Sequence, residues 1–148
     1  PCQGSCTYIT CQMRRGISEK VRRLVAERAY FRCEYCRIHS DDMFLSFEID
    51  HVIPIKHGGN NAIDNLAFAC PHCNQHKGSD FATLLDNFED IVILFNPRIH
   101  QWSTHFEVRD GEILPKTRIG QASVKIFRFN QPDLLILRQL LMQTGRYP

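Results

Sequence analysis

The chain has 148 residues, of which 43% are hydrophobic and 23% are charged, and its formal net charge is +2. These values are typical of a single soluble globular domain of ordinary composition. No apolar run approaches the ~18 residues that a membrane-spanning helix requires, so we expect no membrane partner. The first twelve residues lack the basic and apolar segments of a signal peptide, which predicts a cytoplasmic location.

Residues 1–12 show no hydrophobic periodicity, and we expect them to be a disordered leader or a cloning remnant. They contain Cys2, Cys6 and Cys11, whose role is left open and could include a second metal site. The first predicted helix begins after Ser18, a favourable N-cap residue, because apolar side chains recur behind it at helical spacing.

A basic stretch overlaps this helix. Residues 14–37 contain eight Lys or Arg against three Glu, although the chain as a whole is almost neutral. A local concentration of positive charge favours contact with a polyanion such as nucleic acid, whereas a solvated helix face would have the same composition. The candidate nucleic-acid-binding residues are Arg14, Arg15, Lys20, Arg22 and Arg23, together with Lys77 from a later helix.

The segment over residues 44–55 alternates apolar and polar side chains and predicts a strand. Asp50 and His51 stand side by side in it, although both are costly to bury without partners. Glycines and asparagines at 56–61 predict a loop, and residues 62–70 return as a second short extended segment. The polar pair in an otherwise apolar strand therefore indicates a functional site.

Four of the seven cysteines form two Cys-x-x-Cys pairs separated by 33 residues. In a reducing compartment, pairs with this spacing bind metal more often than they form disulfides. Four thiolates are the tetrahedral set that a structural zinc ion prefers, and they leave no open position for a substrate. The second pair opens a predicted helix that starts at Pro71 and ends or bends at Gly78. The predicted ligands of one zinc ion per chain are Cys33, Cys36, Cys70 and Cys73.

The rest of the chain differs in character. Residues 80–102 are rich in apolar side chains and predict a mixture of helix and extended segments. Residues 105–115 alternate around an Asp-Gly dipeptide, which is a strong hairpin signal, and two helices are predicted over 120–130 and 131–145. We expect residues 81–148 to be an α/β extension that packs on the first part of the chain as the same domain.

Read in order, the earlier segments are a Cys-x-x-Cys pair, "EIDHVIP", a Gly-Gly loop, "DNLAFAC" and "CPHCNQHKG". Together they resemble the HNH endonuclease family, whose ββα-metal motif runs Asp-His, then Asn-Leu, then Cys-Asn-x-x-Lys-Gly. The match covers residues 33–78, and flanking stretches such as "RLVAERAYFRCEYC" and "LFNPRIHQWSTHFEV" also look like small stand-alone bacterial HNH proteins. The resemblance implies an α+β fold. Its ββα-metal (His-Me finger) core, with the N-terminal helix, would span residues 13–80 and be stapled by the four-cysteine zinc site.

The resemblance also implies an activity, the metal-dependent hydrolysis of phosphodiester bonds in DNA. His51 would be the general base that takes a proton from water. Asp50 and Asn74 would hold a catalytic divalent cation, Mg²⁺ or another, because Mg²⁺ prefers hard oxygen ligands. Asn65 matches the middle Asn of the motif, which helps to hold the hairpin and to orient the histidine.

Two points of geometry stay open in the sequence. Asp50 and His51 can share a site only if the strand ends or kinks there, because consecutive strand residues point to opposite faces. His76 is an alternative metal ligand, but it lies about 200° from Asn74 around a helix, so only one of the two can face the site.

The alternative function is a non-catalytic, zinc-stabilised nucleic-acid-binding module, and a third possibility is a protein-interaction module that uses the C-terminal half. The intact trio of Asp50, His51 and Asn74 favours the endonuclease, since a pure binder does not require it. RNA is not excluded as a substrate, and a monomer or weak homodimer is expected. Among the remaining side chains, we expect His72 to be exposed and Trp102 to be part of the core.

Overall fold

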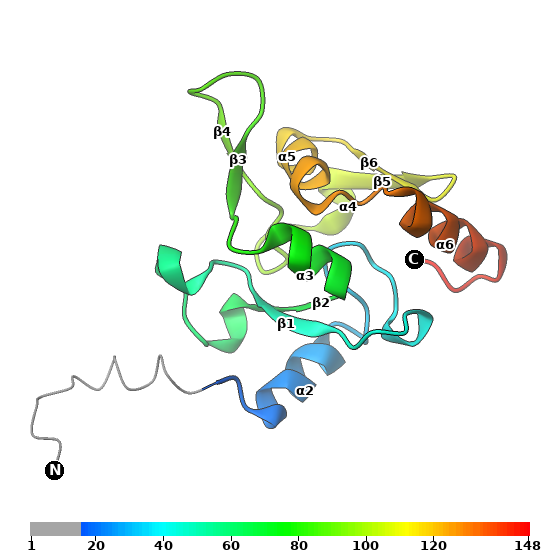
Figure 1. Cartoon of the computed structure of the whole chain (residues 1–148), viewed down its shortest axis with the longest axis horizontal. Helices are drawn as coiled ribbons and strands as arrows, with labels where there is room; N and C mark the ends of the chain where they lie inside the picture. Colours follow the sequence, from blue (N-terminus) through cyan, green and yellow to red (C-terminus); the bar gives the residue numbers. More distant parts are fainter. Residues whose placement is uncertain (1–15) are drawn as a thin grey trace, which may run out of the picture.

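The computed structural model describes residues 16–148, which form a mixed α+β protein with three two-stranded antiparallel hairpins (Figure 1). The predictions for residues 1–12 and their cysteines, and for Arg14 and Arg15 as DNA contacts, fall outside the described residues. No helix within residues 16–148 combines the length and hydropathy that a membrane crossing demands.

Helix α2 (Glu19–Arg28) starts where the sequence predicts. The Ser18 hydroxyl accepts a hydrogen bond from the Val21 N–H at 3.4 Å, which caps the first turn. One face of the helix buries Val25 and Ala26 in a small apolar cluster with side chains of the next hairpin. This packing fixes α2 against the part of the chain that carries the predicted site.

The centre of this part is a β-hairpin followed by a helix. Strand β1 (Glu48–His51) pairs antiparallel with β2 (Leu66–Ala69), so that His51 lies opposite Leu66. Helix α3 (Pro71–Lys77) follows at once and packs against both strands (Figure 1). The order of elements is therefore the ββα arrangement that the resemblance implies.

Strand β1 is shorter than the strand predicted over residues 44–55. Regular pairing ends at His51, and the Val52 N–H makes one further bond to the Asn65 carbonyl at 2.9 Å. Pro54 then begins the short 3-10 helix η2 (Ile55–His57), and the ladder cannot continue through it because a proline has no N–H to donate. Asp50 and His51 are thus the last two residues of the strand. The other 3-10 helices are η1 (Ser40–Asp42) and η3 (Ile63–Asn65).

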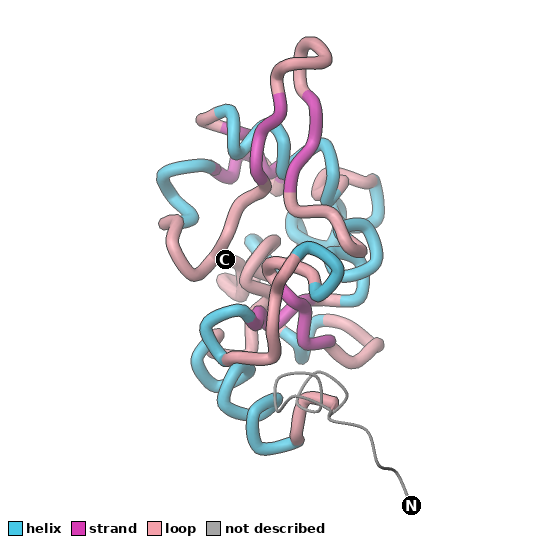
Figure 2. Tube along the Cα trace, turned by 90° about the vertical axis from the view of Figure 1, so that its left-hand side faces the viewer, coloured by secondary structure: helices cyan, strands magenta, loops and turns pink. Residues whose placement is uncertain are grey.

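The C-terminal half adds two hairpins and three helices. They are β3 (Ala82–Leu84), β4 (Ile91–Ile93), α4 (Trp102–His105), β5 (Phe106–Arg109), β6 (Glu112–Pro115), α5 (Arg118–Phe127) and α6 (Pro132–Gln143). The predicted turn at Asp110 and Gly111 is confirmed, since both residues have the positive φ angles, 51° and 82°, that a type I′ turn requires. The helix expected within residues 80–102 is absent apart from the start of α4. The chain there forms the β3–β4 hairpin, which projects from the molecule (Figure 2).

One hydrophobic cluster joins the two halves. It contains the four paired cysteines together with Phe95, Phe127 and Phe129 from the C-terminal half. Trp102 packs against this cluster and donates its indole N–H to the Tyr35 carbonyl at 2.8 Å, in keeping with the predicted core role. The C-terminal half therefore covers the paired cysteines, while the position of any domain boundary stays a prediction.

Candidate active site

The four paired cysteines meet in the core. Their Sγ atoms lie within 4.8 Å of one another, and all four residues are completely buried. A tetrahedral zinc ion with Zn–S bonds of about 2.3 Å would place its sulfurs about 3.8 Å apart. The Sγ atoms of Cys36 and Cys70 are 3.6 Å apart. The cluster therefore has a geometry consistent with a structural zinc ion.

The chemistry of the cluster also favours a cation. Burial raises the pKa of the Cys73 thiol well above its ordinary value. Backbone N–H groups point at two of the sulfurs, from Cys36 to Cys33 Sγ at 3.5 Å and from Cys73 to Cys70 Sγ at 3.4 Å. These dipoles carry only partial charge, so a full set of thiolates in this apolar surrounding needs a bound positive ion.

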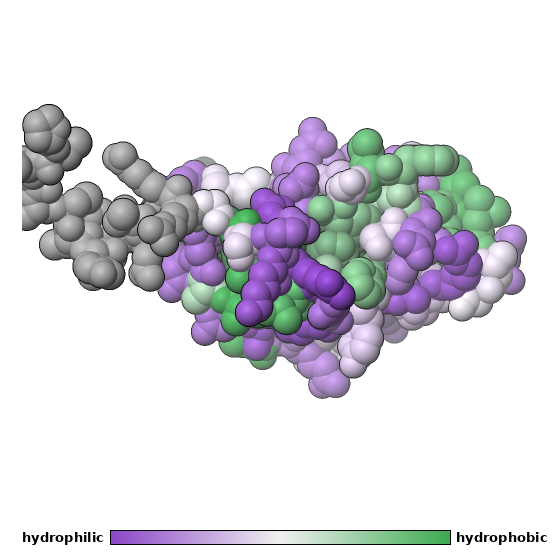
Figure 3. Space-filling model, turned by 90° about the horizontal axis from the view of Figure 1, so that it is seen from below, coloured by the Kyte–Doolittle hydropathy of each residue, from purple (hydrophilic) through white to green (hydrophobic). Residues whose placement is uncertain are grey.

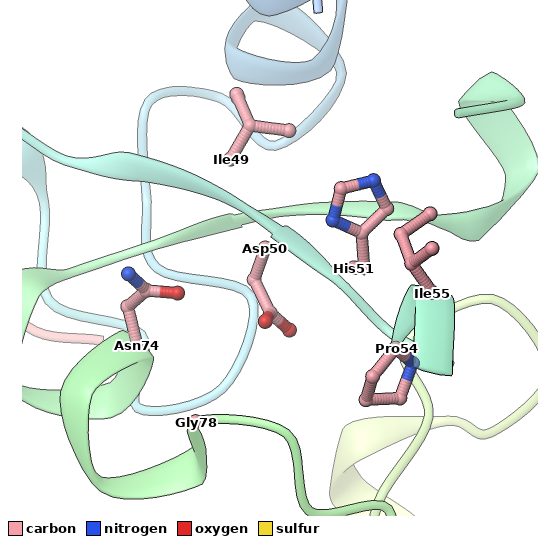
Figure 4. A pocket seen from close by; sticks show the side chains of 7 residues that line it. All are labelled: Ile49, Asp50, His51, Pro54, Ile55, Asn74 and Gly78. Carbon is pink, nitrogen blue, oxygen red and sulfur yellow. The ribbon is translucent and has the colours of Figure 1, made fainter. Parts of the chain in front are cut away.

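A pocket of about 290 Å³ opens beside α3 and is lined by residues of β1, η2 and α3. Asp50, His51 and Asn74 are all part of its lining. Figure 4 shows the Asn74 side chain directed from α3 toward Asp50, whereas the His51 ring leaves β1 on its other side. All three residues contribute to the lining of one pocket, although Asp50 and His51 leave β1 on opposite sides.

The Asp50 carboxylate is buried and well supplied with partners. The Tyr35 hydroxyl donates to Oδ2 at 2.5 Å, and Lys77 Nζ lies 3.1 Å from Oδ1 and 3.0 Å from Oδ2. Burial raises the pKa of Asp50 above its ordinary value, an effect that the Lys77 ammonium and the Tyr35 hydroxyl oppose. Burial also raises the pKa of Tyr35 well above its ordinary value, so its hydroxyl remains a donor. A carboxylate has about four lone-pair sites, and these contacts leave few of them for another ligand.

Lys77 occupies a different place from the one predicted for it. It is 2% exposed, and its ammonium also donates to the His51 carbonyl at 2.7 Å. Lys77 thus links α3 to β1 and does not face solvent, which argues against the predicted contact with nucleic acid. The sequence could not reveal this pairing, because Asp50 and Lys77 are 27 residues apart with no pattern that relates them.

The His51 ring is half-buried and is held by a residue that the sequence analysis did not single out. His51 Nε2 lies 2.7 Å from Oδ1 of Asn61, in the loop between β1 and β2. The sequence gives little indication of this contact. Asn61 is the second asparagine after the Gly-Gly pair, and asparagines are also common in polar loops without such a role.

Asn65 fastens the same loop to the end of β1. Its Oδ1 accepts from the Ile53 N–H, and its Nδ2 donates to the carbonyls of Ile53 and Asn60, each at 2.9 Å. The loop packs so tightly that a Cβ on Gly59 would lie 1.7 Å from the Ile53 oxygen, which only glycine avoids. Asn65 therefore has the contacts needed to hold the hairpin.

Of the two candidate ligands on α3, Asn74 lines the Asp50 pocket and His76 does not. The His76 ring lies against His72, with ring centroids 4.0 Å apart. His72 was predicted to be exposed, and this is wrong. It is half-buried because the end of α5 lies over it, and its Nε2 is 2.8 Å from the Phe127 carbonyl. Burial also lowers the pKa of His72.

The described basic candidates lie on α2. Lys20 and Arg23 are exposed, and Arg22 is half-buried with its Nε 3.4 Å from the Ile17 carbonyl. Arg23 pairs with Glu27 at 2.8 Å on the solvent side of the helix. Figure 3, which views the molecule from the side of α2, shows hydrophilic side chains projecting from this face. The outer face of the helix therefore presents charge to solvent.

Comparison with known proteins finds a family model that matches the region of these features. Residues 33–80 match the sequence model of the family described as HNH endonuclease. The chain is also 25% identical over 126 residues to the Septu protein PtuB of Bacillus thuringiensis, covering 84% of this chain and 46% of that protein. The chain thus spans about half the length of this relative, and no solved structure gives a significant match. The ββα arrangement, the four-cysteine cluster and the family match identify an HNH endonuclease domain in this chain.

Proposed function

We propose that this protein is a metal-dependent endonuclease that hydrolyses phosphodiester bonds of DNA. The observation that carries the proposal is that Asp50, His51 and Asn74 border one pocket within the HNH domain. Phosphodiester hydrolysis needs an activated water and a positive charge near the phosphate. An imidazole can activate the water, and a carboxylate with a carboxamide can hold the cation that would supply the positive charge.

Asp50 and Asn74 are the residues that would hold the divalent cation. Two protein oxygens suit Mg²⁺, which keeps several of its waters and binds few protein ligands. When bound, the cation would offset charge on the phosphate and on the leaving oxygen. The Asp50 carboxylate fits this role through the lone pairs that Tyr35 and Lys77 do not use.

His51 is proposed as the base that accepts a proton from the attacking water. Its ring is half-buried at the edge of the pocket, where water can reach it while its partner in the loop restricts its motion. A positioned base accelerates such a step by typically 10²–10⁴-fold. Zinc in the cysteine cluster would have a structural role, since it would hold the start of α3 and therefore Asn74 in place.

Three basic residues of α2 are proposed to contact the phosphate backbone, the exposed Lys20 and Arg23 and the half-buried Arg22. Such contacts bind nucleic acid with little sequence preference, so DNA is the proposed substrate without a defined target, and RNA is compatible with the same surface. A single candidate site within residues 16–148 favours nicking of one strand by a monomer, whereas a weak homodimer would bring two such sites together and could cut both strands.

The test is a supercoiled-plasmid assay over a series of divalent cations, with His51→Ala as the matched variant. The wild type should nick plasmid with Mg²⁺, lose activity on brief chelation and regain it when Mg²⁺ alone is added back. His51→Ala should keep the melting temperature, because the ring lies at a pocket edge, and should cut at least ~10²-fold more slowly. Cleavage by His51→Ala at the wild-type rate would refute the proposed base.

The second candidate is a zinc-stabilised nucleic-acid-binding module without catalysis. The observation that favours it is that Tyr35 and Lys77 already occupy most of the lone-pair sites of the Asp50 carboxylate. In that case the wild type would bind DNA but leave plasmid supercoiled with every cation tested. Isothermal titration with Mg²⁺ and no DNA would also give no heat of binding.

A further inference from the structure

We propose that Asn61 is the positioning residue that fixes the tautomer of the His51 imidazole, with the proton on Nε2 and the lone pair on Nδ1. The inference rests on the proposed function, since it assigns Asn61 a part in preparing the general base. Asn61 does not touch the reacting atoms. It acts through His51 alone.

The hydrogen bond between the two side chains determines which nitrogen carries the proton. A neutral imidazole has one N–H and one lone pair, and an amide oxygen can only accept. Asn61 Oδ1 lies 2.7 Å from His51 Nε2, so Nε2 must be the donor. The proton on Nε2 leaves Nδ1 unprotonated, which is the state that can accept a proton from water.

The loop that carries Asn61 is built to hold this position. Ahead of it, Asn60 Oδ1 accepts from the Ala62 N–H at 3.0 Å, which forms a tight turn around Asn61. Asn65 Nδ2 donates to the Asn60 carbonyl at 2.9 Å and so fastens the turn to the end of β1. The amide oxygen of Asn61 is therefore presented to His51 by a loop with little freedom, which lowers the entropic cost of orienting the ring.

The opposite arrangement has a distinct consequence. If the Asn61 amide were rotated so that its NH₂ group donated to Nε2, the His51 proton would sit on Nδ1. The lone pair would then be consumed by Asn61, and no nitrogen would be left to accept a proton from water. The two arrangements differ in which ring nitrogen is protonated, and that difference can be measured directly.

The experiment is ¹H–¹⁵N spectroscopy of the imidazole groups in full-length protein at about pH 8.5, where an imidazole without strong partners is neutral. His51 is assigned by comparison with His51→Ala. The wild type should show an Nε2-bound proton for His51 that is slow to exchange with water, and an Nδ1 shift typical of an unprotonated nitrogen. A proton on Nδ1 in the wild type would overturn the proposal without any variant at Asn61.

Three loop variants then separate positioning from general loop stability. Asn61→Ala removes the acceptor and should lose the slowly exchanging Nε2 proton. Asn61→Asp keeps an acceptor oxygen and should restore that proton. Asp64→Ala is the matched control, because it changes an exposed residue of the same β1–β2 connection and leaves the Asn60 turn and the Asn61 oxygen in place. It should keep the His51 signal, and loss of the signal in the control would overturn the specific role of Asn61.

The rate of plasmid cleavage by the same variants tests whether the His51 tautomer matters for the proposed reaction. Asn61→Ala should cut roughly ten- to a hundredfold more slowly, the range seen when a partner that orients a metal-bound histidine is removed. Asn61→Asp should recover at least part of that loss. If Asn61→Ala loses the Nε2 proton but cuts at the wild-type rate, the positioning role is wrong while the endonuclease stands. If the wild type does not cut at all, the endonuclease is wrong, and the spectra still report whether Asn61 fixes the ring.

Discussion

The two ends of helix α3 hold their polar groups in opposite ways. At its N-terminal end, Cys70 and Cys73 are completely buried and face two further thiols across an apolar core. At its C-terminal end, Asn74 and Lys77 face Asp50 beside an open pocket. The first end offers four equivalent ligands and no access, which suits a structural ion. The second end mixes an acid, an amide and an ammonium next to solvent, which suits a site that binds and releases a substrate.

This contrast also separates two ways of stabilising one helix. The cysteine end depends on an ion from outside the chain, because burial disfavours the thiolates that would bind it. The Asp50 end contains its own cation, since Lys77 lies within 3.1 Å of both carboxylate oxygens. We therefore expect folding to depend strongly on zinc and weakly on Mg²⁺.

The largest effect is expected at the cysteine end. Cys70→Ser removes one ligand but keeps a side-chain oxygen that can replace Cys70 as the N-cap of α3. The variant should therefore lose zinc and cooperative unfolding for lack of the thiolate alone, given the ~10–16 kcal/mol that zinc binding contributes in small zinc-dependent folds. Elemental analysis and thermal denaturation check this. A zinc-free wild type that unfolds cooperatively would contradict it.

The next largest effect is expected at the other end of α3. Asp50→Ala leaves the Lys77 ammonium buried without a counter-ion, which should cost roughly 3–5 kcal/mol of unfolding free energy. Adding Lys77→Met to that variant removes the stranded charge and should return much of the stability, measured by urea denaturation. Neither protein should cut plasmid. If the double variant is no more stable than Asp50→Ala, the pair is not the source of the loss.

A smaller effect is expected on the α2 surface. Replacing Arg22 and Arg23 together by Ala should flatten the dependence of DNA affinity on salt by about 0.9 per lost phosphate contact. Zinc content should not change, because the helix packs away from the cysteine cluster. Arg109→Ala is the control, since Arg109 is an exposed arginine paired with Glu107 on β5. An unchanged slope in the double variant would assign these arginines to a solvated helix face.

The smallest effect on stability is expected at Tyr147, which packs beside the buried cysteine cluster. The Tyr147 hydroxyl donates to the Cys36 carbonyl at 2.8 Å, and the residue is 6% exposed. Tyr147→Phe should keep zinc and lower the unfolding free energy by about 1 kcal/mol, the usual net contribution of one such bond. Chemical denaturation of the zinc-loaded protein measures the difference.

Local signals in the sequence were sufficient for much of this architecture. The N-cap at Ser18, the proline that opens α3 and the turn at Asp110 and Gly111 each depend on a few neighbouring residues, and all three were predicted correctly. The clustering of the four cysteines also followed from their spacing. Such features can be predicted from sequence because they depend only on local backbone geometry or on a repeated type of ligand residue.

The contacts that the sequence did not reveal are those between unlike side chains far apart in the chain. Lys77 reaches Asp50 only because α3 packs across β1, and His72 is covered only because α5 ends above it. Asn61 meets His51 through the shape of the connection between β1 and β2. No periodicity or composition in the sequence marks these three contacts. Each could be identified only from the tertiary structure.

The bond from Tyr147 to Cys36 has a consequence for how the protein is made. The two residues are separated by 111 positions, so the first Cys-x-x-Cys pair leaves the ribosome long before the residue that covers it. During that interval the nascent chain exposes the Cys33 and Cys36 thiols, because neither the second cysteine pair nor Tyr147 is yet in place. We therefore expect cotranslational access to zinc, or a chaperone that shields free thiols, to affect the yield of folded protein more than its final stability.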